Sequence, residues 1–234
     1  MGDHAQREQD EIDPPTLHPP DPAPDPEAIE AGRLLFAQEC RFVTSAAKED
    51  GLPPDVLPEV AFLGRSNVGK SSLVNALTGR TTLARVSNTP GRTRLINFFA
   101  LPRLMLVDLP GYGFAVAPKD EKRRWQSLVP RYVRGRAGLK RALVLIDARH
   151  GFLKGDRDFM ALLDDAAVSY QIVLTKIDKL APAAVTARLD AMAAELARHR
   201  AAHPQMHVTS AREGWGIDIL RASLAALAAT EPAR

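Results

Sequence analysis

The chain has 234 residues, of which 45% are hydrophobic and 25% charged, and its formal net charge is +3. This is the composition of a globular protein with a sizeable core. It excludes an internal disulfide, because Cys40 is the single cysteine. The acidic N-terminus also lacks the apolar segment of a signal peptide, and no stretch is long and apolar enough to span a membrane. We therefore expect a cytoplasmic protein that does not enter a membrane.

Charge is unevenly distributed along the chain. Residues 1–30 carry nine acidic side chains and one basic one, a net charge of −8, which leaves +11 on the remaining 204 residues. The proline- and acid-rich stretch "DPPTLHPPDPAPDPE" cannot build a core, so we expect residues 1–30 to form a disordered tail. The basic remainder should attract polyanions, and the acidic tail should mask part of that positive charge.

Apolar residues at helical spacing in "EAIEAGRLLFAQECRFVTSAA" predict a short extension over residues 31–58, packed on the body. From residue 59 to 234, continuous apolar runs alternate with helical patterns, which predicts an α/β domain with helices on both faces of a six-stranded, mostly parallel sheet. One closely spaced strand pair should be antiparallel. The expected strands are 60–64, 94–101, 103–109, 141–147, 170–175 and 206–210, and the expected helices are 70–79, 119–135, 154–166, 182–200 and 214–230.

The stretch "GRSNVGKSS" (64–72) follows the first of these strands and fits the phosphate-loop pattern GxxxxGK[ST]. Gly64 and Gly69 allow backbone angles and close approaches that a Cβ would block. The loop N–H groups and the Lys70 ammonium suit phosphate oxygens, and the Ser71 hydroxyl suits Mg²⁺. The pattern alone leaves ATPases, kinases and GTPases open.

Three later motifs distinguish among these classes. "DLPG" (108–111) ends a strand, so that Asp108 can reach Mg²⁺ and Gly111 can offer its N–H to the terminal phosphate. "TKID" (175–178) places Asp178 to accept hydrogen bonds from guanine N1–H and N2–H₂, a donor pair that adenine lacks. "TSA" (209–211) brings N–H groups toward guanine O6. Each motif alone is usually a strand end or a turn, but together, at the carboxyl ends of strands, they predict a GTP site.

The segment "SNTPGRTRLINFF" (87–99) lies between the phosphate loop and "DLPG". With "LPEVAFLGRSNVGKSSLVNALTGR", "DLPGYGFA" and "LTKIDK", it resembles the EngB (YihA/YsxC) family of bacterial GTPases, in the Era-like/TrmE branch of P-loop GTPases. The resemblance covers roughly residues 42–229. It implies a small G-protein fold, a role in assembly of the large ribosomal subunit, and an association with cell division and septation.

The resemblance also implies site residues. It makes Thr93 the switch residue that meets Mg²⁺ and the γ-phosphate, with Thr89 as the competing threonine. The expected catalytic residues are Lys70, Asn67 and Thr93, and the expected metal ligands are Ser71, Thr93 and Asp108. The expected nucleotide-binding residues are Gly64, Arg65, Ser66, Asn67, Val68, Gly69, Lys70, Ser71, Ser72, Gly91, Arg92, Thr93, Arg94, Leu95, Asp108, Leu109, Pro110, Gly111, Thr175, Lys176, Ile177, Asp178, Thr209, Ser210 and Ala211.

Hydrolysis is expected to be slow, because Tyr112 occupies the position where many GTPases have the glutamine that orients the attacking water. Relatives with an asparagine at the position of Asn67 can bind K⁺ there, which would supply positive charge. The alternative is that Asn67 only stabilises the loop turn. Arg65 and Arg92 are further sources of charge, more simply explained as phosphate- or solvent-facing residues.

The segment "KRRWQSLVPRYVRGRAGLKR" (122–141) carries eight basic residues and no acidic one. Its arginines favour a polyanion such as RNA, whereas Trp125 and Tyr132 suit core packing. The expected partners are GTP or GDP and the large ribosomal subunit or its precursor, with no DNA, and the expected state is a monomer. The alternative function is a GTP-responsive interaction protein acting directly in division.

Overall fold

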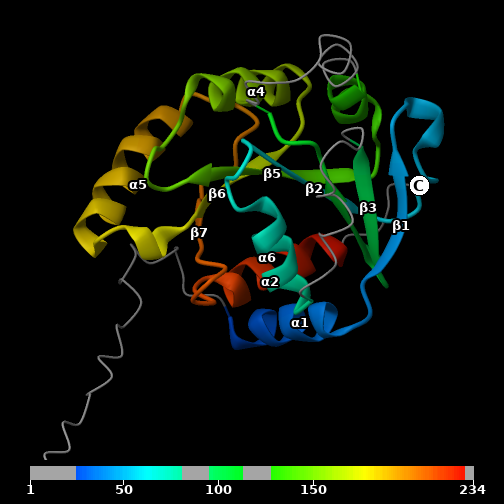
Figure 1. Ribbon diagram of the computed structural model, residues 1–234, viewed down its shortest axis with the longest axis horizontal. Helices are drawn as coiled ribbons and strands as arrows, with labels where there is room; N and C mark the ends of the chain where they lie inside the picture. The colour runs from blue at the N-terminus through cyan, green and yellow to red at the C-terminus, as the bar shows by residue number, and fades with distance from the viewer. Residues whose placement is uncertain (1–24, 81–94, 113–127, 230–234) are drawn as a thin grey trace, which may run out of the picture.

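The computed structural model describes residues 25–80, 95–112 and 128–229. Within these ranges seven strands form one sheet in the order β1-β3-β4-β2-β5-β6-β7 (Figure 1). The strands are β1 (Arg41–Ala46), β2 (Glu59–Gly64), β3 (Ile96–Leu101), β4 (Leu104–Asp108), β5 (Leu139–Asp147), β6 (Tyr170–Thr175) and β7 (His207–Val208).

The strands from β4 to β7 are parallel, and the two outer pairings, β3 with β4 and β1 with β3, are antiparallel. Every residue of β2 and β6 is buried, as their continuous apolar sequences indicate for strands covered on both faces. The predicted α/β class and the antiparallel pair are confirmed. The predicted number of six strands is wrong, because β1 was not expected.

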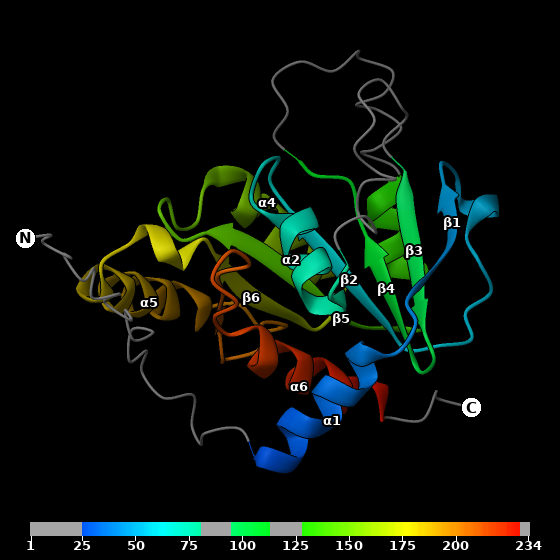
Figure 2. The same cartoon turned by 60° about the horizontal axis from the view of Figure 1, so that its bottom comes forward.

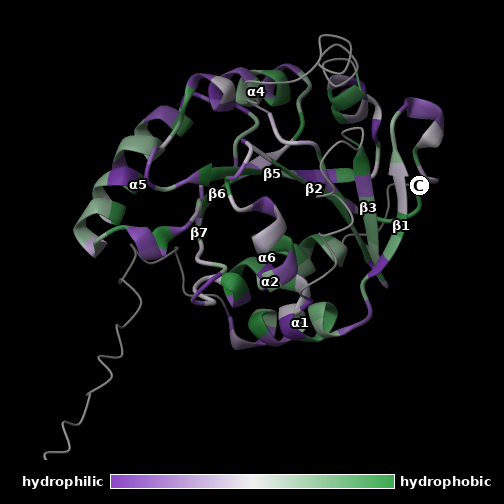
Figure 3. Ribbon diagram, viewed as in Figure 1, coloured by the Kyte–Doolittle hydropathy of each residue, from purple (hydrophilic) through white to green (hydrophobic). Residues whose placement is uncertain are grey.

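Helices cover both faces of the sheet (Figures 1 and 2). One layer holds α4 (Lys154–Asp165), α5 (Pro182–Leu196) and the helical residues 128–135; the other holds α1 (Pro26–Ala37), α2 (Lys70–Thr78) and α6 (Ile217–Ala228). Short 3₁₀ turns, η1 (Glu49–Gly51) and η3 (Ile177–Lys179), complete the described elements. Figure 3 shows strands that are largely hydrophobic, with a few hydrophilic segments, between helices that alternate hydrophobic and hydrophilic residues. In the described ranges no helix has the length and apolar character needed to cross a membrane.

The N-terminal region corrects two expectations. Helix α1 begins at Pro26, capped by the Asp25 side chain, so residues 26–30 belong to a helix and not to the expected disordered tail. Residues 41–46 form an edge strand, although helical spacing was predicted through them. Aromatic and β-branched residues at positions 42–44 favour a strand, and β3 offers its free edge.

Helix α1 packs on α6, which lies beside it in Figure 2. The contact depends on Gly32, because a Cβ there would lie 2.5 Å from the backbone nitrogen of Ala222. Leu35 and Phe36, both buried, then reach the core shared with α2 and α6. The N-terminal extension is thus joined to the domain by a helix and by a strand of the main sheet.

The structure also corrects the prediction for the basic segment, residues 122–141. Arg136, whose side chain is 9% exposed, packs against Glu59, with Nε 2.9 Å from Oε2 and Nη1 donating to the carbonyl of Pro53 at 2.9 Å. Arg141 donates to Gln171 at 2.9 Å. Tyr132 is buried and donates to Glu59, which confirms core packing for this aromatic residue. These two arginines therefore stabilise the fold and are not available to a polyanion.

Basic residues 122–124 and Trp125 lie outside the described residues. Within the described part of the segment, Arg131 lies 3.5 Å from Glu49, with both side chains exposed. Arg134 is exposed and Lys140 is half-buried. The surface that the segment offers to a partner is therefore smaller than its sequence suggests.

Candidate functional site: a nucleotide pocket at the carboxyl edge of the sheet

The phosphate loop joins β2 to α2. Gly69 has φ +106°, in the left-handed region that favours glycine, and directly precedes the helix. Asn67 has φ 63° and is exposed. The loop borders a pocket of about 420 Å³ at the N-terminus of α2, where backbone N–H groups and the helix dipole favour anions. The residues that line it are Arg65, Ser66, Asn67, Val68, Gly69, Lys70, Ser71, Ser72, Gly111 and Lys176.

Lys70 and Asp108 meet at this pocket. The ammonium of Lys70 donates to Oδ1 of Asp108, and Asn97 on β3 donates to Oδ2 of Asp108 at 3.4 Å. Asn97 in turn accepts a 2.6 Å hydrogen bond from Ser45 on β1. Four polar side chains from four elements are thus aligned from the phosphate loop to the edge of the sheet. The structure brings together Lys70 and Asp108, which the sequence analysis assigned to one nucleotide site from two separate motifs.

The "DLPG" segment runs against the backbone of the phosphate loop. Tyr112 N donates to Gly64 O at 3.2 Å, and Ser66 N donates to Tyr112 O at 3.1 Å. These bonds place Gly111 at the pocket wall. Leu109, by contrast, is buried in the core, and its N–H donates to Phe62 O. Its expected contact with nucleotide is therefore not supported by the position of its side chain or its N–H.

The side chain of Tyr112 packs into the core under α4. Its hydroxyl donates to Asp156 at 2.7 Å, and its ring stacks on Phe159 with centroids 5.3 Å apart. Burial and the Asp156 carboxylate raise the pKa of Tyr112 far above its ordinary value, so the phenol stays protonated. This side chain is held by α4 and does not stand at the phosphate loop as a substitute for glutamine.

A second pocket, of about 170 Å³, adjoins the first. Asp178 lies in it and accepts a 2.8 Å hydrogen bond from Ser210 Oγ, while Lys179 Nζ lies 3.1 Å from its other oxygen. Burial raises the pKa of Asp178, but the hydrogen bonds from Ser210 and Lys179 outweigh it, so the net pKa is lowered and the group is ionised. The residues lining this pocket are Gly69, Ser72, Leu73, Thr175, Lys176, Asp178, Lys179, Thr209, Ala211 and Arg212.

Two residues of "TKID" tie this pocket to the phosphate loop. Thr175 Oγ1 donates to Val68 O at 2.6 Å, and Lys176 Nζ donates to Asn67 O at 2.5 Å. Lys176 is held in the left-handed region at φ 60°, and it lines both pockets. Ile177 is buried, and Thr209 is buried with its hydroxyl on Leu174 O, so these two residues support the strand ends.

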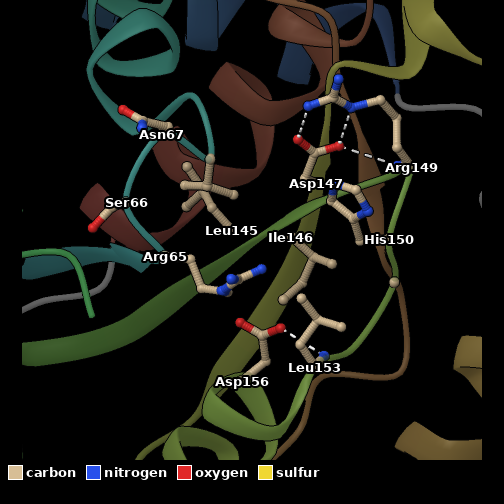
Figure 4. Close-up of a pocket in the computed structure, with 12 residues that line it drawn as sticks. Arg65, Ser66, Asn67, Leu145, Ile146, Asp147, Arg149, His150, Leu153 and Asp156 are labelled. Atoms are coloured by element: carbon tan, nitrogen blue, oxygen red, sulfur yellow. Dashed lines mark hydrogen bonds and ion pairs between the residues drawn. The ribbon is translucent and has the colours of Figure 1, made fainter. Parts of the chain in front are cut away.

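A third pocket, of about 220 Å³, lies on the other side of the phosphate loop (Figure 4). Arg65 points into it toward Asp156, whereas Ser66 and Asn67 point to the opposite side of the loop. Arg65 thus faces the segment between β5 and α4, which makes it a less direct phosphate ligand than the sequence suggested. Asp147 and Arg149 form the far wall.

The predicted and the observed sets of site residues differ in two ways. Gly91, Arg92, Thr93 and Arg94 lie outside the described residues, and Leu95 directly precedes β3. Asn97, Asp147, Lys179 and Arg212 were not predicted. A polar residue inside the apolar strand "INFFAL" was the available signal for Asn97, and the position of Asp147 at a strand's carboxyl end was the signal for that residue.

No cluster of three or more His, Cys, Asp or Glu side chains with metal-binding geometry occurs in residues 25–80, 95–112 and 128–229. The oxygen donors at the phosphate loop, the Ser71 hydroxyl and the Asp108 carboxylate, are nevertheless the kind that Mg²⁺ takes when phosphates and water supply its remaining ligands.

The family model described as "50S ribosome-binding GTPase" matches residues 59–176, which include the phosphate loop, "DLPG" and the lysine of "TKID". A probable GTP-binding protein EngB from Rhodospirillum rubrum is 61% identical over 207 residues, which cover 86% of this chain and 90% of the relative. The chain belongs to the EngB family of GTP-binding proteins. EngB relatives from Cereibacter sphaeroides and Gluconobacter oxydans are 53% and 54% identical over 89% and 88% of this chain, and over 97% and 92% of the relatives.

Solved structures agree on the fold. The structure of a probable GTP-binding protein EngB superposes on this one with a TM-score of 0.59 at 24% identity. The alignment covers 73% of this chain and 98% of the EngB chain. Era in complex with MgGDPNP and a segment of 16S ribosomal RNA has a TM-score of 0.55 at 22% identity, over 77% of this chain and 60% of that one. The domain is thus a P-loop GTPase fold, and the chain is a GTP-binding protein.

Proposed function

We propose that this EngB-family protein is a slow GTPase that acts as a nucleotide-gated factor in assembly of the large ribosomal subunit, in the cytoplasm and as a monomer. Its effects on cell division and septation follow from that role. The observation that carries the nucleotide part is the meeting of Lys70, Asp108 and Asp178 along one edge of the sheet, around two adjoining pockets.

In this proposal the larger pocket takes the phosphates and the smaller pocket takes guanine. Asp178, ionised and held by Ser210, accepts from guanine N1–H and N2–H₂. The stem of Lys176 lies across the base. The N–H groups of Thr209 and Ser210 donate to Leu174 O and Trp215 O, so the N–H of Ala211 is the one proposed to face guanine O6. Adenine offers no such donor pair, so the carboxylate would keep only Ser210 and Lys179 as donors, which disfavours adenine.

Lys70 and Asp108 change partners when nucleotide binds. Lys70 moves from the Asp108 carboxylate to phosphate oxygens, and Asp108 is released to hold the cation with Ser71 and Thr93. Mg²⁺ held by these residues would neutralise phosphate charge. The Asn97 amide remains on Asp108 and keeps its carboxylate aimed at the pocket.

Hydrolysis is slow because Tyr112, the residue that follows "DLPG", points its side chain into the core under α4. Tyr112 is committed to Asp156 and Phe159, so no residue at that position orients water as glutamine does. The exposed side chain of Asn67 lies on the phosphate side of the loop (Figure 4), which suits a K⁺ ion that supplies charge to the reaction.

The ribosomal part is supported by the family description, "50S ribosome-binding GTPase", and by the net charge of +11 outside the first 30 residues. It is tested by pelleting purified large subunits with the full chain through a sucrose cushion, with GDP or a non-hydrolysable GTP analogue at physiological salt. Co-sedimentation with the analogue alone is expected. A Lys70→Ala variant, which should not bind the analogue, serves as the control and should stay in the supernatant.

The second candidate is a GTP-responsive interaction protein that acts directly in septum formation. The acidic, proline-rich N-terminal sequence favours it, because such segments recruit protein partners. Absence of co-sedimentation in either nucleotide state, with guanine nucleotide binding intact, would favour this second function over ribosome assembly.

A further inference from the structure

Asp147 and Arg149 form a closed ion pair beside the nucleotide pockets. Asp147 is the last residue of β5. Arg149 donates to its carboxylate three times: Nη2 at 2.7 Å from Oδ2, Nε at 2.9 Å from Oδ1, and the backbone N at 3.1 Å from Oδ1 (Figure 4). The planar guanidinium therefore fixes the orientation of the carboxylate by paired bonds.

The same carboxylate accepts a hydrogen bond from Lys176. Lys176 Nζ lies 2.9 Å from Asp147 Oδ2 and also donates to Asn67 O at 2.5 Å. The lysine ammonium therefore joins the phosphate loop to β5, while its backbone belongs to the base-recognition motif. Because Lys176 lines both pockets, the position of its side chain sets the wall that they share.

A long lysine side chain has many rotamers, and fixing it costs conformational entropy. The Asp147 carboxylate restricts Lys176 before nucleotide arrives, and Arg149 restricts Asp147. Burial raises the pKa of Asp147, but the hydrogen bonds from Arg149 and Lys176 outweigh it and hold the pKa well below its usual range. The carboxylate is thus charged at neutral pH.

The neighbouring ion pair between Arg157 and Glu195 does not reach the phosphate loop. Arg157 makes an equally well-formed bidentate pair with Glu195, at 2.6 and 2.8 Å, but both residues lie on the outer helices α4 and α5. Arg157 is 48% exposed and Arg149 is 45% exposed. The two pairs therefore differ in their connection to Lys176 and not in their exposure.

We propose that Asp147 and Arg149 are positioning residues that hold Lys176 against the phosphate loop and thereby slow the release of guanine nucleotide. The proposal rests on the guanine site described under the proposed function. It predicts an effect on the dissociation rate constant, with little effect on association, because the clamp acts on a pocket wall that is already formed.

The test is stopped-flow dissociation of a fluorescent GDP from the full chain, chased with excess GDP. Arg149→Ala should release nucleotide about threefold to fivefold faster, as expected for loss of one partly exposed pair. Asp147→Ala should release it about tenfold faster or more, since Lys176 then loses its carboxylate partner and keeps only the carbonyl of Asn67. Asp147→Asn, which keeps an acceptor oxygen, should fall between them, and Arg149→Lys should recover part of the loss. Association rate constants should stay within about twofold of wild type.

Arg157→Ala is the matched control and should leave the dissociation rate unchanged. A double-mutant comparison separates positioning from a general effect on the fold: in a Lys176→Met background, Arg149→Ala should have no further effect. Since Arg149 is on the surface, its variant keeps the test valid even if a change at Asp147 prevents folding.

Two results would overturn the proposal: a dissociation rate for Arg149→Ala equal to that of Arg157→Ala, or an equal acceleration by Arg149→Ala with and without Lys176. A different result would contradict the proposed function itself. If the wild-type chain does not retain fluorescent GDP at all, the guanine site itself is wrong, and the clamp is overturned with it.

Discussion

The charged clusters at the two ends of β2 differ in what surrounds them. At the amino end, Glu59 is 1% exposed and accepts hydrogen bonds from Tyr132 and Arg136, so its charge is satisfied inside the protein. At the carboxyl end, Lys70 and Asp108 pair at the wall of a pocket. Charges at the first end stabilise the fold, whereas we propose that those at the second exchange partners with a ligand. Burial of charge alone therefore does not identify the functional end of the sheet; the adjoining pockets do.

The largest effect should come from the carboxyl end. Lys70→Ala removes the cation that meets phosphate, so affinity for a GTP analogue should fall by about 100-fold or more, the equivalent of a lost charged hydrogen bond. Titration calorimetry measures it. Lys154→Ala, at a lysine that is 93% exposed on α4, is the matched control and should bind normally. Equal affinities of the two variants for the GTP analogue would contradict the assignment of the nucleotide site to this end of the sheet.

Asp178→Asn tests the base pocket. An asparagine can donate where the carboxylate accepts, so preference should shift from guanine to xanthine nucleotides, with GTP affinity reduced about 100-fold. Competition between GDP and XDP for the same variant measures the shift. Full retention of GTP preference would mean that Asp178 does not face the base.

Glu59→Gln tests the amino end. The amide keeps the shape but leaves the Arg136 cation with only the more distant Asp55 carboxylate, 3.9 Å away, as a counter-charge, so the free energy of unfolding should fall by about 3 kcal/mol. Nucleotide affinity should be unchanged. Urea denaturation measures the loss, and Glu30→Gln, at an exposed ion pair with Arg33, should show no measurable change. A loss of nucleotide affinity at constant stability would contradict the separation of the two ends.

A second structural group, the buried His207 at the start of β7, should make stability depend on pH. Burial, together with His203 and Arg141, lowers its pKa from 6.5 to about 4. The unfolded histidine takes up a proton as the pH falls below 6.5, whereas the folded one does not until about pH 4. Stability is therefore full above pH 6.5 and decreases by up to about 3 kcal/mol toward pH 4. Unfolding of His207→Phe, compared with wild type across this range, should lack that part of the decrease. A parallel pH dependence in the two proteins would exclude His207 as its source.

The smallest effect should come from Tyr112, which adjoins the functional end but packs into the core. Tyr112→Phe leaves Asp156 short of one donor, so stability should fall by about 1 kcal/mol, while GTP hydrolysis stays within about twofold. Thermal unfolding and phosphate release measure the two quantities. A large loss of hydrolysis at constant stability would place the phenol at the reaction instead of in the core.

Much of this arrangement could be predicted from the sequence, because the determining residues are local. The phosphate loop, "DLPG" and "TKID" each follow a strand recognisable from its apolar run, and parallel strands bring their carboxyl ends to one edge. Strand β1 was missed because an edge strand exposes Phe42 and Val43, so its apolar pattern does not distinguish it from a helix. The roles of Arg136 and Arg141 were missed because they depend on partners distant in sequence, Glu59 and Gln171. The Asp147–Lys176 contact likewise requires the β5–β6 register.

The measurement that tests the central claim most directly is the purine selectivity of the wild-type chain, by titration with GDP, a GTP analogue and ADP in the presence of Mg²⁺. A site built on Lys70, Asp108 and an ionised Asp178 should bind both guanine nucleotides and should bind ADP at least about 100-fold more weakly. Equal binding of ADP and GDP would contradict the assignment of the smaller pocket to guanine, and with it the nucleotide-gated function.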